Sequence, residues 1–245
     1  MYAARCIISE PSTRGIEDSS STPHRLPAGS ISSPCYYRAP MIFALDLEGV
    51  LAPEIWPILG AHFDLPELSL TTRDLADFSE LMHRRVDATR SKSLTLKQLQ
   101  TVAHSVEPYL GARDFLVRLR SLGQVVIISD TFHEFSEPLV QKLGGHSLFA
   151  NRFELDGNGT LKGFKLRIRG QKERIVSGFR SAGFPVAAVG DSLNDLSLLK
   201  SCDHPVLYRP VAALRDEFPN SPLAHNLDEA LVFLQNAVRF EENGM

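Results

Sequence analysis

The chain has 245 residues, of which 43% are apolar, and its formal net charge at pH 7 is −3. This length suffices for one large domain, or one domain with a smaller insert, around a sizeable core. The slightly acidic charge argues against general attraction to nucleic acids or membrane surfaces. The cysteines Cys6, Cys35 and Cys202 are odd in number and far apart, which excludes a disulfide framework and fits a cytoplasmic location. No apolar run approaches the about 20 residues that span a bilayer.

Residues 1–40 differ from the rest in composition. They are rich in Ser, Pro and Arg and have no periodic apolar face, so they cannot bury enough surface to offset the entropy lost on ordering. They lack the apolar stretch of a secretory signal. Their Ser and Arg content is compatible with a transit peptide, an alternative that the acidic residues Glu10, Glu17 and Asp18 weaken. We expect a disordered extension or a misassigned start, with the folded part beginning at Met41.

Residues 42–45 form an apolar run that predicts a buried parallel strand. The run ends in Asp46-Leu47-Glu48-Gly49. Two carboxylates at this spacing are costly beside a buried strand, because like charges repel and burial penalises both. A divalent cation would remove most of that cost. One interpretation makes Asp46 a nucleophile and Glu48 its proton-transfer partner, and the other makes the segment a solvated acidic turn.

Residues 56–106 are expected to form a small helical insert. Prolines punctuate the start of this region, and apolar side chains recur at helical spacing between Asp74 and Arg90. Thr95 and Gln98 then form a capping-box pattern that predicts the start of a further helix.

From Pro108 onward the pattern alternates between strands and helices. Helices are expected at residues 112–122, 132–143, 171–182, 194–200 and 226–238, and strands at 124–131, 149–155, 161–168, 185–192 and 204–208. The segments 149–155 and 161–168 flank an Asp-Gly-Asn-Gly-Thr turn that predicts a β-hairpin. The alternation as a whole predicts an α/β fold with a parallel sheet and right-handed crossovers.

Three of the buried strands end in polar clusters, at residues 46–49, 129–131 and 190–195. Since the carboxyl ends of parallel strands share one edge of a sheet, these clusters can converge. Asp191 and Asp195 beside Asp46 and Glu48 suit a hard cation with oxygen ligands, of which Mg²⁺ is the first choice. The alternative for residues 190–195 is a solvated loop with a helix N-cap.

An anion site is the second feature of this edge. Ser129 and Thr131 precede a predicted helix, where hydroxyls and backbone N–H groups can bind an anion or merely cap the helix. Lys172 could neutralise a phosphate, but Lys162 and Lys165 compete for that role, and each could equally be a solvated surface lysine.

Together these segments resemble the four motifs of the haloacid dehalogenase superfamily of phosphotransferases: DLEGV at 46–50, IISDT at 127–131, a later lysine, and GDSLND at 190–195. The resemblance implies a Rossmann-like core at residues 41–55 and 107–238 with residues 56–106 as a helical cap. It implies that Asp46 forms an aspartyl-phosphate and that Glu48 is the acid/base. It also implies a Mg²⁺ site with Asp46, Glu48 and Asp191 as ligands, supported by Asn194 and Asp195. Ser129 and Lys172 would bind the phosphate, and Thr131 and Asn194 would belong to the substrate-binding residues as well.

Within the superfamily the chain is most similar to phosphoserine phosphatases, whose helical cap lies between the first two motifs. That resemblance implies hydrolysis of O-phospho-L-serine, a step of serine biosynthesis. Glu54 and Arg85 match the cap residues that hold the two charged ends of phosphoserine, with Arg84 as an alternative to Arg85. Phe78 and Met82 would line the same pocket.

Two departures from the family pattern concern the first motif. Glu48 stands where Asp is usual, and Val50 replaces a hydroxyl residue. The sequence around them resembles a branch of phosphoserine phosphatases that also pass the phosphoryl group to homoserine. Competing hypotheses are another small phosphometabolite as substrate and a non-catalytic phosphate-binding regulator. Whether the chain forms a homodimer stays open.

Overall fold

The computed structural model describes residues 40–245 except 73, 76, 169–170 and 244–245. The predicted N-terminal extension therefore lies outside the described residues, apart from Pro40. Cys6 and Cys35 lie outside them as well. Cys202 is a free cysteine.

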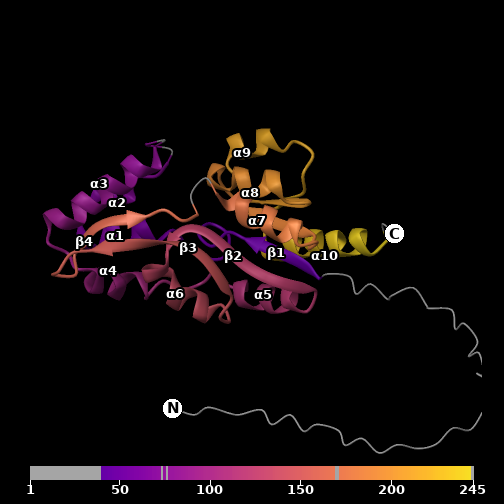
Figure 1. The fold of residues 1–245 in the computed structure, drawn as a ribbon, viewed down its shortest axis with the longest axis horizontal. Coiled ribbons are helices and arrows are strands. Elements are labelled where there is room, and N and C mark those ends of the chain that lie inside the picture. Colours follow the sequence, from indigo (N-terminus) through magenta and orange to yellow (C-terminus); the bar gives the residue numbers. More distant parts are fainter. Residues whose placement is uncertain (1–39, 73, 76, 169–170, 244–245) are drawn as a thin grey trace, which may run out of the picture. The chain divides into compact units, whose positions relative to one another are not determined.

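The described part of the chain contains a seven-stranded sheet in the order β4-β3-β2-β1-β5-β6-β7 (Figure 1). All neighbouring strands are parallel except β3 and β4, which are antiparallel. The predicted α/β fold is thus confirmed, with β1 at the centre between β2 and β5. The strands are β1 (Met41–Leu45), β2 (Gly123–Phe132), β3 (Ser147–Leu155), β4 (Leu161–Lys165), β5 (Val186–Gly190), β6 (His204–Tyr208) and β7 (Leu223–Ala224).

Helices follow the strands in the expected alternation. They are α1 (Ile55–Phe63), α2 (Pro66–Ser69), α3 (Phe78–Ser91), α4 (Leu96–Ala103), α5 (Ala112–Arg120), α6 (His133–Lys142), α7 (Lys172–Ser181), a 3₁₀ turn (Leu193–Asp195), α8 (Leu196–Ser201), α9 (Ala212–Glu217) and α10 (Leu227–Asn243). None of the described helices is both long enough and apolar enough to cross a membrane.

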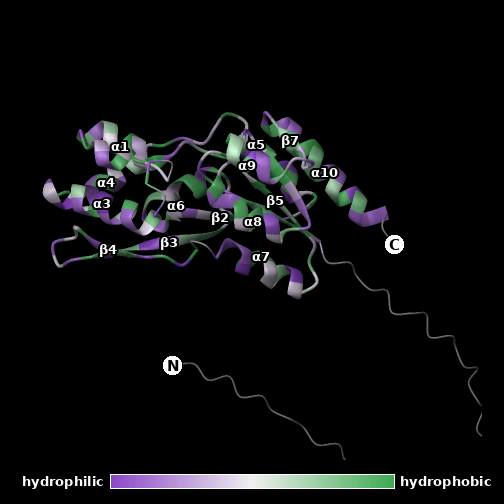
Figure 2. Cartoon of the chain, turned by 90° about the horizontal axis from the view of Figure 1, so that it is seen from above, coloured by the Kyte–Doolittle hydropathy of each residue, from purple (hydrophilic) through white to green (hydrophobic). Residues whose placement is uncertain are grey.

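Helices cover both faces of the sheet, and the side chains of β1 alternate between them. Phe43 and Leu45 pack in the cluster that includes α5, α6 and α10, whereas Ile42 and Ala44 pack with α7, α8 and α9. Figure 2 shows the corresponding hydrophobic colour along β5 and mixed colours on α10, which presents one face to solvent. A central strand buried on both sides needs the continuous apolar run that the sequence has.

Helices α1 to α4 lie in the chain between β1 and α5, where the sequence predicts a helical insert, and they gather at one end of the sheet (Figure 1). We refer to these four helices as the insert. The capping box at Thr95 is confirmed, with the side chains of Thr95 and Gln98 bonding reciprocally to backbone N–H groups. This reciprocal bonding satisfies N–H groups that the first turn of α4 would otherwise leave unpaired.

The predicted hairpin is confirmed, with two differences in its limits. β3 begins at Ser147 and pairs first with β2 before continuing outward to pair with β4. β4 ends at Lys165, because the N–H groups of Arg167 and Ile168 donate to Oδ1 of Asn151 instead of continuing the ladder. The hairpin turn also meets the insert, since Leu96 N–H donates to Gly159 O.

Candidate active site

The turn after β1 brings two strand ends into close approach. Asp46 is the first residue beyond β1, and its N–H donates to Val189 O in β5 at 3.1 Å. Gly49 follows with φ +83°, and a Cβ on Gly49 would overlap the carboxylate of Asp191. A glycine here therefore allows both the left-handed backbone and the contact with Asp191.

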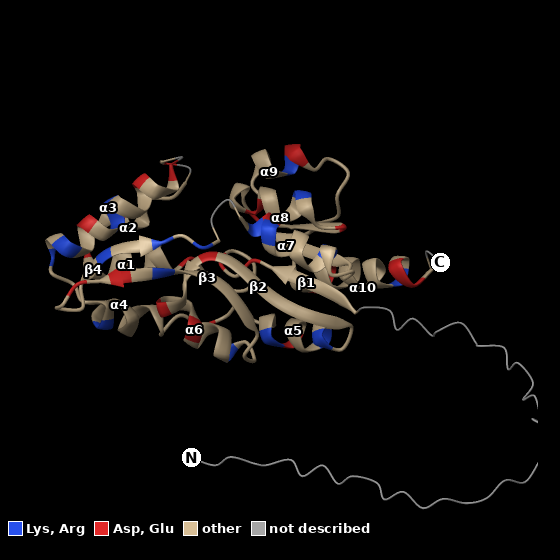
Figure 3. Cartoon of the chain, in the orientation of Figure 1, with Lys and Arg blue, Asp and Glu red and all other residues tan. Residues whose placement is uncertain are grey.

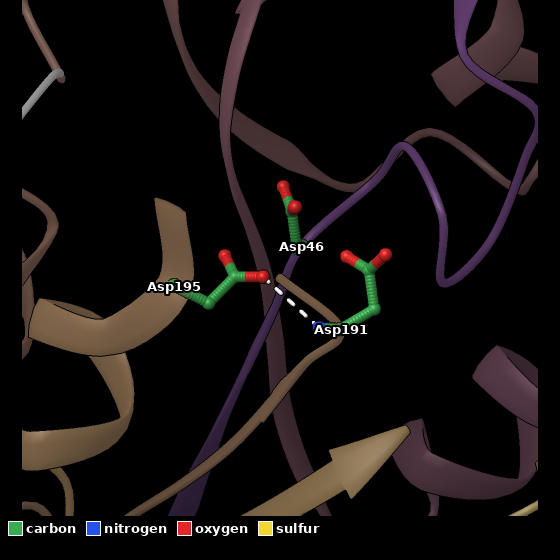
Figure 4. A group of neighbouring side chains, drawn as sticks. All are labelled: Asp46, Asp191 and Asp195. Atoms are coloured by element: carbon green, nitrogen blue, oxygen red, sulfur yellow. Dashed lines mark hydrogen bonds between the residues drawn. The ribbon is translucent and has the colours of Figure 1, made fainter. Parts of the chain in front are cut away.

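Asp46, Asp191 and Asp195 form an acidic group at this edge, with one oxygen of each lying within 4.8 Å of the others (Figure 4). Both oxygens of Asp195 already accept hydrogen bonds. Its Oδ2 accepts from Asp191 N–H at 3.0 Å, and its Oδ1 accepts from Lys172 Nζ at 2.8 Å. Asp46 and Asp191 are thus the better candidates to bind a cation, and Asp195 orients the loop that carries Asp191.

The acidic group holds more negative charge than the fold itself neutralises. Burial and the nearby Asp195 raise the pKa of Asp46 well above its ordinary value. The same two causes raise the pKa of Asp191 to about 7. In Figure 3, acidic segments lie where the central strands end, between the α1–α4 group and the α7–α9 group. Crowded, partly buried carboxylates of this kind fit a hard divalent cation.

Lys172 is the lysine that the fold brings to this group. It begins α7 and is 1% exposed, and its Nζ lies 3.2 Å from Asp130 Oδ2 and 3.4 Å from Asp46 Oδ1. Burial alone would lower its pKa, but Asp130, Asp195 and Asp46 together raise it well above the ordinary value. Lys165 instead pairs with Glu154 on the hairpin surface and is 71% exposed. Lys162 is exposed too.

Glu48 lies on the side of the site that faces the insert. Its Oε1 accepts from Ile55 N–H at 2.8 Å. Burial and the neighbouring Glu54 raise the pKa of Glu48 to about 8, against the lowering effects of Ile55 N–H, Arg85 and the Thr131 hydroxyl. A carboxyl group that holds its proton near neutral pH can act as a general acid. Glu48 does not belong to the three-carboxylate group.

Ser129 and Thr131 lie in the last residues of β2, both buried. The helix that follows begins at His133, with Phe132 as its N-cap. The interpretation of residues 129–131 as a helix N-cap is therefore wrong. The strand pairing shifts register between Ile128 and Phe132, and this irregularity aims the side chains at the cavity instead of along a regular strand.

A cavity between the strand ends and α1 to α3 is lined by most of the predicted site residues. Its lining includes Asp46, Glu48, Glu54, Phe78, Arg85, Ser129, Thr131 and Asn194. Met82 is not among the lining residues in the described chain. It is fully buried, and its Sδ accepts from Arg85 Nη1 at 3.7 Å. Arg84 points away, pairing with Glu80 at the surface.

Sequence reasoning did not assign a site role to several other lining residues. These are Trp56, Thr71, Thr72, Leu81, Asp130 and Ser192. Asp130 lies inside the second motif, so its place in the sequence was a signal from which a site role could have been predicted. For Trp56 the sequence favours the simpler interpretation that its ring packs inside the insert. Thr71 and Thr72 come from an irregular segment between α2 and α3, where no periodic pattern exists to indicate which side chains face inward.

The model of the haloacid dehalogenase-like hydrolases matches residues 41–203, which are most of the chain. The chain belongs to this family. The hydrolase is 37% identical over 188 residues to the phosphoserine phosphatase ThrH of Pseudomonas aeruginosa, an alignment covering 77% of this chain and 92% of that one. It is 38% identical over 188 residues to a phosphoserine phosphatase of Pseudomonas syringae pv. tomato, covering 77% and 79% of the two chains.

Solved structures share the fold of this hydrolase. A substrate-bound phosphoserine phosphatase complex superposes with a TM-score of 0.70 at 18% identity, covering 80% of this chain and 99% of that one. A phospho-aspartyl intermediate analogue of phosphoserine phosphatase gives a TM-score of 0.69 at 18% identity, with the same coverage. Phosphatases of the haloacid dehalogenase-like family depend on a metal, and the acidic group of this hydrolase fits one.

Proposed function

We propose that this hydrolase is a phosphoserine phosphatase that converts O-phospho-L-serine and water to L-serine and phosphate. The observation that carries the proposal is the cavity that Asp46 shares with Glu54 and Arg85. One end offers the carboxylate of Asp46, which lies 3.4 Å from Nζ of the buried Lys172. The other end offers an anion and a cation, which complement the ammonium and carboxylate groups of an amino acid. The relatives named phosphoserine phosphatase support the same substrate.

In the first step, an oxygen of Asp46 attacks phosphorus and the bond from phosphorus to the serine oxygen breaks. Glu48 donates its proton to that oxygen, so that serine leaves as the neutral alcohol. In the second step, Glu48 takes a proton from water, the water oxygen attacks phosphorus, and Asp46 is released with phosphate. Dividing the displacement in this way replaces one difficult step with two easier ones.

The positive charges of the site act on the phosphoryl group. Lys172, with the hydroxyl of Ser129 and the neighbouring Thr131, would hold its oxygens and offset the repulsion from Asp46. We propose Mg²⁺ as the metal and Asp46 and Asp191 as its side-chain ligands, since hard carboxylate oxygens suit that ion. Bound Mg²⁺ would supply further neutralisation of the phosphate charge. Glu48, predicted as a third ligand, bonds to Ile55 N–H instead, which favours the proton-transfer role for it.

The cap residues would fix the rest of the substrate. Glu54 would bind the ammonium group and Arg85 the carboxylate, while Phe78 and Asn194 close the cavity wall. The Nε atom of Arg85 is buried and makes no hydrogen bond to any described residue. A buried donor without an acceptor is costly, and a substrate carboxylate would supply that acceptor. Met82 supports Arg85 from behind instead of lining the pocket.

Phosphate release from phosphoserine is the direct test, measured with Mg²⁺ and with EDTA, and in each case with and without homoserine. We expect Mg²⁺-dependent release. Formation of phosphohomoserine would establish the transfer reaction, which stays a prediction from resemblance. The cytoplasmic location stays a prediction from the cysteine content, and homodimer formation stays open. Turnover of phosphosugars or nucleotides in preference to phosphoserine would contradict the substrate. Phosphate binding without any release would favour the regulatory alternative.

Replacing Arg85 with Ala should raise KM for phosphoserine by about 10- to 100-fold. This is the effect expected from losing one hydrogen bond between charged groups, which contributes about 1.5–3 kcal/mol to the free energy of binding. KM for O-phosphoethanolamine, which has the ammonium group but no carboxylate, should change much less. Steady-state kinetics on both substrates measure the difference. Arg84→Ala is the matched control, because Arg84 is exposed and pairs with Glu80 at 2.6 Å. Equal KM changes for both substrates would refute the role of Arg85.

Without metal, the protein should lose stability as pH rises from about 5 to 9. The folded-state pKa values of Asp46, Asp191 (about 7) and Glu48 (about 8) lie above those of the unfolded chain. Stability from the protonated groups is therefore complete below about pH 4 and is lost as pH passes through the folded values. Thermal unfolding in EDTA measures this trend. Added MgCl₂ should raise Tm most at the alkaline end, and a pH-independent metal effect would argue against the acidic group as its site.

A further inference from the structure

Trp56 is the one tryptophan of the chain. It lies in the first turn of α1, is 4% exposed and contributes to the wall of the active-site cavity. Its ring packs edge-on against Phe135 at 5.3 Å, Phe153 at 6.0 Å and Phe132 at 6.3 Å between centroids. Three aromatic neighbours from α6, β3 and the end of β2 therefore fix the plane of this indole relative to the core.

Arg85 lies over the face of that ring. The guanidinium carbon of Arg85 lies 4.8 Å from the centroid of Trp56, which is within the range of a cation–π contact. On its other sides, Nη2 donates to Leu70 O at 2.6 Å and Nη1 to Met82 Sδ at 3.7 Å. The guanidinium is thereby held in one place and one plane, with Nε left without a hydrogen bond to any described residue.

Arg85 needs such support because it is 5% exposed and has no carboxylate partner among the ion pairs of the described residues. Burial lowers the pKa of Arg85 to about 10, while the charges of Glu48 and Glu54 oppose that change. The electron-rich face of an indole stabilises a desolvated cation, and it does so without neutralising it. The charge of Arg85 thus stays available to a ligand.

We infer that Trp56 is a positioning residue for substrate selection: its ring holds Arg85 so that the Nε edge meets the carboxylate of the substrate. This inference rests on the proposed phosphoserine phosphatase activity, which it deepens. Trp56 does not touch the phosphoryl group in this scheme. Loss of the Trp56 ring should therefore lower kcat/KM for a substrate with a carboxylate more than for a substrate without one, instead of lowering both values equally.

The first experiment compares kcat/KM for phosphoserine with kcat/KM for O-phosphoethanolamine. In Trp56→Leu the ratio of the two should fall about tenfold or more, and Trp56→Phe, which keeps an aromatic face, should restore part of it. In an Arg85→Ala background, Trp56→Leu should change the ratio no further. Phe115→Leu is the matched control, because Phe115 is buried in α5, is not among the residues that line the cavity, and is not among the ring neighbours of Trp56 in the described chain. It should lower Tm and leave the ratio unchanged.

An unchanged ratio in Trp56→Leu, or the same fall in Phe115→Leu, would overturn the inference. Either result could occur in an enzyme that hydrolyses phosphoserine normally. Failure of the proposed function is distinct, since the wild-type protein would then release no phosphate from phosphoserine at all.

A second measurement avoids substituting Trp56, so it does not depend on how that variant folds. As the sole tryptophan, Trp56 reports on Arg85 through intrinsic fluorescence. In Asp46→Asn protein with MgCl₂, titration with phosphoserine should change the emission, and O-phosphoethanolamine should change it much less. Adding Arg85→Ala should remove the difference. Equal changes with both ligands in the Asp46→Asn protein would count against a carboxylate bound at Arg85 beside the ring.

Discussion

Phosphoserine hydrolysis should fall by at least about 10³-fold when Asp46 is replaced with Asn, while the protein stays folded. Asn keeps the size and shape of the side chain, and its carbonyl oxygen can still accept from Leu47 N–H, which bonds to Asp46 Oδ1 at 2.8 Å. An amide does not attack phosphorus as a carboxylate does, so no phosphate can be carried on residue 46. Phosphate release and thermal unfolding, measured on the same preparation, separate the two properties.

The sign of the stability change distinguishes a lost nucleophile from a damaged fold. Because burial and Asp195 raise the pKa of Asp46, its ionised form destabilises the metal-free protein. Asp46→Asn should therefore have an equal or higher Tm than wild type in EDTA at pH 7–8, and the advantage should vanish below about pH 4, where Asp46 is protonated in both states.

Asp156→Asn offers a control of opposite sign. Asp156 lies in the hairpin turn, where hydrogen bonds from Thr160 and from backbone N–H groups lower its pKa. Its ionised form thus supports the fold above the unfolded pKa, so the substitution should cost stability at neutral pH and leave turnover intact. Near-normal phosphate release from Asp46→Asn would refute the nucleophile assignment, and an equal loss in Asp156→Asn would point to the fold as the cause.

The central strands could be predicted because their local pattern and their environment agree. β1 and β5 are apolar throughout and buried on both faces, so composition alone indicates parallel strands. The first and last residues of β3 and β4 were harder to predict, because β3 pairs first with β2 and then with β4. Only the tertiary fold determines the residue at which the pairing partner changes. The short elements α2, α9 and β7 carry too few residues for a periodic signal.

In the site, too, some residues could be predicted from local sequence and topology, and others depend on the tertiary fold. Asp46 and Asp191 follow buried strands directly, so parallel topology was enough to predict their convergence. The contacts of Lys172 with Asp130 and of Arg85 with Trp56 join distant segments, and no local pattern specifies them. The resemblance to phosphoserine phosphatases assigned Phe78, Met82 and Arg85 to the pocket, but neither it nor helical spacing indicated that Leu81 reaches the cavity while Met82 lies behind Arg85.

Lys172→Met should impair both turnover and folding, and the second effect should depend on pH. Loss of the cation that faces the phosphoryl group should lower kcat by about 10²- to 10³-fold. The same change leaves Asp46, Asp130 and Asp195 without their shared partner, which at neutral pH should cost about 3–5 kcal/mol of stability. Chemical denaturation in EDTA and phosphate release with Mg²⁺ measure the two effects.

The pH dependence of the stability of Lys172→Met follows from the protonation of Asp46. Without Lys172, the pKa of Asp46 loses the lowering influence of that cation and rises further, so the variant regains stability on acidification as this group takes up a proton. The deficit relative to wild type should therefore shrink as pH falls. Lys165→Met is the control, because its exposed pair with Glu154 contributes at most about 1 kcal/mol. If Lys165→Met lost activity and Lys172→Met kept it, the assignment of Lys172 as the phosphate-binding lysine would be refuted in favour of Lys165.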